Sequence, residues 1–231
     1  MKLLEIKNIK KSFGDKEVIK DVTFSIESGK IVGLLGRNGS GKTTIIKLIN
    51  DLLTLDSGEI LVNGEKISEK SKAKISYLPE RTYLDNSKTV EEIFKFFADF
   101  YADFDEEKAT VLLKEFNLEK NQKLSKMSKG MKEKVQLALV MGRNADLYVL
   151  DEPLGGIDPA TRDSVLDTIL RNFGENSSLL ITTHIISDVE RILDEVIIID
   201  DGKIVLEGNA DEIRSERNCS IDETFRRLFR W

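Results

Sequence analysis

The residues with the clearest chemical meaning form a glycine-rich segment, GRNGSGKTT, at residues 36–44. An apolar run, IVGLL, precedes it and a helix-type run, IIKLIN, follows it. Glycines let the backbone wrap tightly, so that successive N–H groups and the start of the next helix point at a phosphate group. The Lys42 amine reaches the outer phosphates, and the Thr43 hydroxyl is a ligand for Mg²⁺. We therefore predict a triphosphate site with contacts from Asn38, Gly39, Ser40, Gly41, Lys42, Thr43 and Thr44.

Two adjacent carboxylates, Asp151 and Glu152, follow a second apolar run, LYVL. Neighbouring residues on a strand point to opposite sides, so the two acids can have different roles. Asp151 suits the shell of a Mg²⁺ ion, and Glu152 suits the task of holding and deprotonating an attacking water. An Asp-Glu pair alone is usually a solvated turn. Its place after an apolar strand, downstream of the phosphate loop, favours hydrolysis of the triphosphate.

His184 is the single histidine of the chain and follows a third apolar run, LLITT. A lone histidine is more often structural than catalytic. Here its place at the end of a core strand predicts that it lies on the same rim as the phosphate loop and Glu152. From there it could contact the terminal phosphate and orient the catalytic water. We therefore predict catalytic roles for Glu152, His184 and Lys42.

These segments need a scaffold that brings strand ends together. Short β-type runs, several of them apolar throughout, alternate with helix-type segments, which predicts an α/β fold with ligands beyond the carboxyl ends of the strands. Between residues 89 and 143 apolar residues recur three and four apart, which predicts a helical subdomain inserted into the core; two ordinary surface helices are the alternative. Strands are expected at residues 3–6, 22–26, 31–35, 60–62, 75–78, 147–150, 179–182, 196–199 and 204–206.

The amino-acid composition and net charge exclude several classes of protein. The chain has 231 residues, 40% hydrophobic and 33% charged, which is typical of a globular protein with a substantial core. The net charge of −6 argues against a nucleic-acid partner, which favours a basic surface. Cys219 is the lone cysteine, so no disulfide within the chain is expected. Neither a signal peptide nor an apolar run long enough to span a bilayer is visible, so any membrane role must come through a partner.

The phosphate loop, the Asp-Glu strand end and the histidine, in this order, resemble the ATP-binding subunits of ABC transporters. The segment MSKGM, residues 127–131, stands where that family has its LSGGQ signature; it keeps Ser128 and Gly130 and departs at three positions. The segment GGID, residues 155–158, matches the family's D-loop and carries over Asp158.

Two more positions carry the resemblance. Phe13 falls where the family places an aromatic that stacks on adenine; an ordinary core residue at a strand end is the alternative reading. In YLPE, Glu80 stands in place of the family's Q-loop glutamine. A carboxylate still ligates Mg²⁺ but does not donate a hydrogen bond as an amide does.

The resemblance implies one ABC ATPase domain over residues 1–231. Residues 1–88 and 144–231 would form a P-loop NTPase core, with a RecA-like sheet and an antiparallel β-subdomain, and residues 89–143 the helical subdomain. ATP and Mg²⁺ would be the cofactors. Implied nucleotide contacts beyond the phosphate loop are Phe13, Val18, Ser128, Lys129, Gly130 and Asp158, and implied metal contacts are Thr43, Glu80 and Asp151.

The resemblance also implies a mode of action. Two copies, or this chain and a related ATPase, would meet head to tail and sandwich ATP between the phosphate loop of one and residues 128–130 of the other. Opening after hydrolysis would drive a separately encoded membrane permease, with this chain cytoplasmic on the inner face of the membrane. SKGM together with YLPE resembles bacterial subunits that serve exporters of drugs, peptides or other amphiphiles.

Two other functions remain open at this point: a soluble ABC-type ATPase acting on DNA or ribosomes, and a regulatory module that uses ATP only as a switch. The end of the chain, residues 221–231, has apolar residues at helical spacing beside basic ones. We expect a short helix packed on the core; a helix lying on a membrane surface is the alternative.

Overall fold

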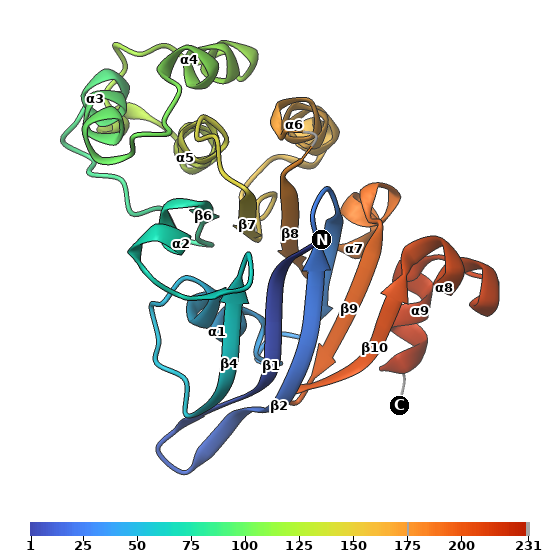
Figure 1. Cartoon of the computed structure of the whole chain (residues 1–231). Helices are drawn as coiled ribbons and strands as arrows, with labels where there is room; N and C mark the ends of the chain where they lie inside the picture. Colours follow the sequence, from blue (N-terminus) through green and yellow to red (C-terminus); the bar gives the residue numbers. More distant parts are fainter. Residues whose placement is uncertain (175, 230–231) are drawn as a thin grey trace.

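The computed structural model describes residues 1–174 and 176–229 and contains two β-sheets (Figure 1). The first has four strands in the order β2-β1-β4-β5 and pairs them antiparallel. The second has six strands in the order β10-β9-β3-β8-β7-β6; its pairs are parallel except at the edge, where β10 is antiparallel to β9. The predicted α/β class is therefore confirmed.

Each predicted strand lies within an observed one, although the first two are much longer than expected. The strands are β1 (Lys2–Phe13), β2 (Lys16–Glu27), β3 (Ile31–Gly36), β4 (Ser57–Val62), β5 (Glu65–Lys66), β6 (Ile75–Leu78), β7 (Leu147–Asp151), β8 (Ser178–Thr183), β9 (Glu195–Asp200) and β10 (Lys203–Asn209). The six-residue strands β3 and β8 are buried at every position, as their continuous apolar runs predict.

Helix α1 (Lys42–Ile49) follows the glycine-rich loop and packs against residues of both sheets. Its buried residues Ile45, Ile46, Leu48 and Ile49 belong to one hydrophobic cluster with side chains of β1, β2 and β4 and with one face of the central strands. Because the apolar faces of both sheets meet in this cluster, the loop at the start of α1 is held from two directions.

The segment predicted to be helical, residues 89–143, contains α3 (Val90–Phe100), α4 (Glu106–Glu115) and α5 (Lys129–Met141). Figure 1 shows α3 and α4 at one end of the molecule, away from the antiparallel sheet. The second half of α5, from Val135 on, is buried in the large core cluster beneath the central sheet. The helical content is thus observed, while the proposed subdomain boundaries stay a prediction.

The remaining helices connect or follow the central strands. They are α2 (Glu69–Ala73), α6 (Pro159–Asn172), α7 (Ile186–Val189), α8 (Ala210–Arg217) and α9 (Ile221–Leu228), with 3-10 turns at Leu124–Lys126 and Glu190–Ile192. In α9, Ile221 is buried and Phe225 packs on the large core cluster, as does Phe229 just after it, which agrees with a packed terminal helix; the last two residues of the predicted segment lie outside the described part. Within residues 1–174 and 176–229, no helix has both the length and the apolar character that crossing a membrane requires.

Arg143 links the helical segment to the central sheet. It is 4% exposed, and its Nε donates to both carboxylate oxygens of Asp103, at 3.0 and 3.2 Å, in the turn between α3 and α4. Its Nη1 donates to the carbonyl of Ile75 at 2.7 Å and its Nη2 to that of Ala73, at the start of β6. The guanidinium also lies over the Tyr101 ring, 4.1 Å from the centroid.

We expect Arg143→Met to destabilise the fold by about 3 kcal/mol, because it leaves a half-buried carboxylate and two backbone carbonyls without their donor. The measurement is the free energy of unfolding in urea. The matched control is Arg171→Met: Arg171 is paired with Glu115 but is 63% exposed, so its loss should cost less than about 1 kcal/mol. Equal effects of the two substitutions would contradict the role assigned to Arg143.

Candidate active site

The glycine-rich loop between β3 and α1 is a tight backbone wrap. Gly39 and Gly41 have φ values of 80° and 114°, which side chains with a Cβ rarely adopt. The N-cap of α1 is Gly41, which offers no side-chain acceptor to the first helical N–H groups. These groups therefore remain available to an anion, and the helix dipole adds to their attraction for phosphate.

The side chain of Lys42 is fixed by carbonyl groups of the glycine-rich loop. The residue is largely buried, at 7% exposure, and its Nζ donates to the carbonyls of Gly36 at 2.8 Å and Arg37 at 3.0 Å. Burial lowers the pKa of Lys42, and the negative charges of Glu152, Asp151 and Glu80 oppose that shift. A cation in this position is poised to exchange carbonyl partners for phosphate oxygens.

Asp151 ends β7 and is 2% exposed. The Thr182 hydroxyl on the neighbouring strand β8 donates to its Oδ1 at 2.6 Å. Burial raises the pKa of this carboxyl, hydrogen bonds from Thr182 and Thr43 lower it, and the charges of Glu152 and Glu80 raise it further. Asp151 and Thr43, predicted as metal ligands from separate motifs, thus lie within hydrogen-bonding distance of each other.

Glu152, the next residue, turns toward His184. Its Oε2 lies 2.9 Å from Nδ1 of the histidine, which stands just past the end of β8. Glu152 has a φ of 53°, in the left-handed region, and its side chain is 14% exposed while that of His184 is 52% exposed. A carboxylate fixed by an imidazole at the mouth of a phosphate site is an arrangement that can hold and deprotonate a water molecule.

One cavity of about 1040 Å³ joins these groups. The predicted site residues that line it follow the ends of central strands, except Val18 in β2 and Lys129 at the start of α5: Val18, Asn38, Gly39, Gly41, Lys42, Thr43, Thr44, Glu80, Lys129, Asp151, Glu152 and His184. Beyond these, Ser40 is buried within the loop with its hydroxyl unpartnered among the described residues. The structure therefore brings the catalytic and metal candidates together in one chain.

Besides Ser40, four predicted nucleotide contacts lie outside the cavity lining: Phe13, Ser128, Gly130 and Asp158. Phe13 is 48% exposed at the end of β1, and the Lys11 amine lies over its ring at 5.6 Å, so it is not a buried core residue either. Ser128 caps α5 by accepting from the N–H of Met131 at 3.2 Å, with Gly130 in the first turn. Asp158 caps α6, accepting from Ala160 at 2.9 Å.

Sequence reasoning missed part of the lining. The β9–β10 turn, Asp201-Gly202, closes the cavity beside the glycine-rich loop, where the N–H of Gly202 donates to the carbonyl of Ser40 at 3.1 Å. An Asp-Gly pair between apolar runs is a recognisable hairpin signal, but its place against the loop is a tertiary fact. Glu133 and Gln136 of α5 also line the cavity, with nothing in their local sequence to mark them.

The acidic residues suit a divalent cation only together with a ligand. Within the described ranges, no group of three or more His, Cys, Asp and Glu side chains could hold a metal by itself. Thr43 and Asp151 supply the hard oxygen donors that Mg²⁺ prefers, and this ion commonly completes its shell with phosphate oxygens and water. The donor set therefore fits Mg²⁺ bound with a nucleotide.

Comparisons with known proteins agree with this geometry. The profile of the ABC transporter family matches residues 19–155. The chain is 34% identical over 217 residues to the ABC transporter ATP-binding protein YtrB of Bacillus subtilis, covering 93% of this chain and 74% of the relative. It is 32% identical to the Nod factor export ATP-binding protein I of Burkholderia lata, covering 96% and 76% of the two chains.

Comparison with solved structures also indicates an ATP-binding subunit of an ABC transporter. An ATP-binding subunit of an ABC transporter superposes with a TM-score of 0.89 at 32% identity, covering 99% of this chain and all of the other. An ATP-binding cassette in its ADP conformation superposes with a TM-score of 0.77 at 25% identity, covering 92% of both chains. With the phosphate loop, Glu152 and His184 assembled at one sheet edge, the chain belongs to the ABC transporter family, as a nucleotide-binding subunit with ATPase activity.

Proposed function

We propose that this chain is the ATP-hydrolysing motor of an exporter and drives a separately encoded permease that moves a drug, a peptide or another amphiphile. The observation that carries the catalytic part is the 2.9 Å contact between Glu152 and His184 at the mouth of the cavity that holds Lys42. A module that only sensed ATP would not need a carboxylate and an imidazole arranged for water activation.

The glycine-rich loop binds the triphosphate. Backbone N–H groups around Gly39 and Gly41 and the start of α1 surround the phosphates, and Lys42 moves from its carbonyl partners to the outer phosphates. Mg²⁺, when bound with the nucleotide, neutralises the charge that develops on the phosphates. Thr43 and Asp151 would hold it, with Glu80 at the cavity rim as the residue in place of the family's glutamine.

Glu152 and His184 handle the water. The carboxylate accepts the proton of a water aligned with the terminal phosphorus, and the imidazole keeps that carboxylate oriented through the Nδ1 contact. The ring of His184 is 52% exposed and lines the same cavity, so it would be available to contact the terminal phosphate. Positioning and charge stabilisation, rather than covalent chemistry, account for the acceleration of phosphoryl transfer.

A second ATPase copy would complete the site, either this chain or a related one. Ser128 and Asp158 are exposed helix caps outside the cavity of their own chain, so they are free to meet another protomer. The N–H groups at the start of α5 would then face the terminal phosphate of the opposite copy. Loss of that phosphate on hydrolysis removes the bridge, and the opening of the pair would be transmitted to the permease.

Export is supported by sequence similarity. Relatives of this chain include proteins named for Nod factor export and for linearmycin resistance. The permease would contact the helical segment, residues 89–143, and the loop that carries Glu80. The chain would act on the cytoplasmic face of the membrane through that contact.

Coupling is tested by measuring ATP hydrolysis of the purified chain alone and reconstituted with its permease in vesicles. We expect the permease to stimulate turnover and amphiphilic substrates to change it further. Turnover indifferent to any membrane partner would favour a soluble ATPase, and binding without turnover would favour a switch.

We expect Glu152→Gln to bind ATP with nearly unchanged affinity but to lower kcat by about 100-fold or more, because the amide does not accept the water proton. Single-turnover hydrolysis and size-exclusion chromatography with Mg-ATP provide the measurement, and the variant should accumulate as a dimer. Rapid turnover by this variant would remove Glu152 from the mechanism.

Lys42→Ala should weaken ATP binding about ten- to a hundredfold, since it removes charge-assisted hydrogen bonds to the phosphates. Affinity is measured by titration calorimetry. Lys47→Ala is the matched control, because Lys47 is exposed in the last turn of the same helix and does not line the cavity. ATP affinity that is equal in both variants would show that the lysine of the loop does not bind phosphate.

A further inference from the structure

Glu133, in the second turn of α5, packs against the backbone of Gly156 in the loop that follows Glu152. A Cβ added to Gly156 would overlap both carboxylate oxygens of Glu133. One turn earlier on the same helix, a Cβ on Gly130 would stand 3.2 Å from the Gly156 carbonyl oxygen. The start of α5 and the loop at residues 152–158 thus touch at backbone distance.

The glycine at position 156 is needed for space rather than for backbone conformation. Gly156 is not among the glycines with positive φ, so an alanine could adopt its backbone conformation. What an alanine would meet is the carboxylate of Glu133. This pairing of a glycine with a facing carboxylate indicates a specific contact between the two segments.

The carboxylate of Glu133 is held there at an energetic cost. Its Oε2 is enclosed and has no hydrogen-bond partner among the described residues, and burial raises the pKa of this group. Its Oε1 lies 3.7 Å from Nζ of the exposed Lys129, a pair that contributes little at a surface. An enclosed acceptor without a donor costs about 1–3 kcal/mol, so folding stability does not account for Glu133 at this place.

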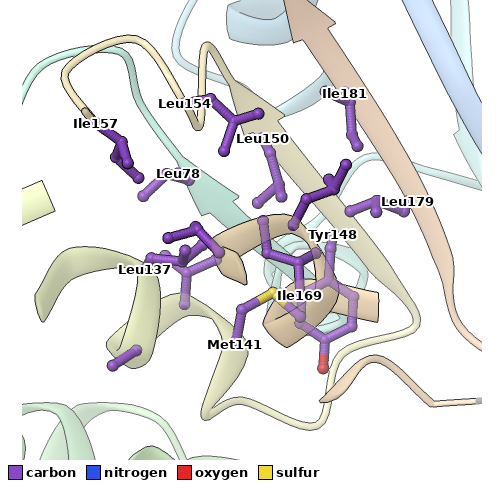
Figure 2. Close-up of a cluster of buried hydrophobic side chains, with 14 of the residues drawn as sticks. Leu78, Leu137, Met141, Tyr148, Leu150, Leu154, Ile157, Ile169, Leu179 and Ile181 are labelled. Carbon is purple, nitrogen blue, oxygen red and sulfur yellow. The ribbon is translucent and has the colours of Figure 1, made fainter. Parts of the chain in front are cut away.

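The opposite side of the loop is anchored in the core. Leu154 and Ile157, at 3% and 4% exposure, point into the cluster that contains Leu78 and Leu150 (Figure 2). Gly155 is exposed and Gly156 is partly exposed, both line the cavity, and the N–H of Gly155 donates to the carbonyl of Glu152 at 3.0 Å. Glu133 therefore supports the loop on the side that the core does not reach, two contacts away from the Glu152 backbone.

We infer that Glu133 is a positioning residue for Glu152: its carboxylate, wedged against Gly156, fixes the turn that aims the Glu152 side chain at the water. This inference rests on the proposed role of Glu152. Glu133 acts through the shape of its contact with Gly156 rather than through its charge. Because it stands three residues after Gly130, it joins the segment that would meet a second protomer to the turn that carries the proposed base.

The contact is tested in the whole chain of 231 residues by one substitution that removes side-chain volume at Glu133 and one that adds it at Gly156. Glu133→Ala leaves the turn unsupported, and Gly156→Ala displaces the carboxylate or the turn; each should lower kcat at least about tenfold, since a misplacement of about 1 Å can cost that much and more. Their KM and ATP affinity should stay within about twofold of the original chain. In the double variant the methyl group introduced at position 156 enters the space that the carboxylate vacates, so kcat should rise above that of either single variant.

Two controls separate positioning from folding. Glu133→Gln keeps the shape and should keep kcat within about twofold, and Glu107→Ala, an exposed glutamate in the first turn of α4, should change nothing. Single variants with unchanged kcat, or a double variant whose losses multiply, would overturn the inference. If Glu152→Gln hydrolyses ATP normally, the proposed function fails instead; if it is inactive while the Glu133 and Gly156 variants are normal, only this inference fails.

Discussion

The arrangement of the site depends on the parallel pairing of β3, β8 and β7. Leu35 of β3 pairs with Thr183 of β8, and Asp151 of β7 pairs with Thr182. Parallel strands end at a common edge, so this register sets the start of the glycine-rich loop, the carboxylates and His184 side by side. A slip of one residue in β7 would turn Asp151 away from Thr182 and reverse the roles of the two acids.

The same strand register also places the buried charged groups of the site near groups that stabilise their charges. Lys42 and Asp151 are both largely buried, and each would be unfavourable as an isolated charge. The charge of Asp151 favours the ammonium of Lys42, and hydrogen bonds from Thr182 and Thr43 favour the carboxylate of Asp151. A nucleotide thus enters a site whose charges are already arranged for it.

The sequence was sufficient to predict the parts of the site whose function lies in the backbone or in strand ends. The glycine-rich loop, Asp151-Glu152 and His184 each follow an apolar run, and that pattern fixes their place at one edge of a parallel sheet. It did not reveal the extent of β1 and β2, because their outer halves mix charged residues into the strand. Nor did it reveal contacts that depend on how separate segments pack: the Asp201-Gly202 turn, the support of Gly156 by Glu133, and the exposed position of Phe13.

The backbone of Glu152 lies in the left-handed region of conformation, with a φ of 53°. A residue with a Cβ in the left-handed region is less stable there by roughly 1 kcal/mol, and glycine or asparagine would fit the same turn more comfortably. The fold therefore gives up some conformational stability at the position of the proposed catalytic acid. Under selection for heat tolerance alone, a residue that fits this turn better would be expected to replace Glu152, with loss of the proposed catalytic acid.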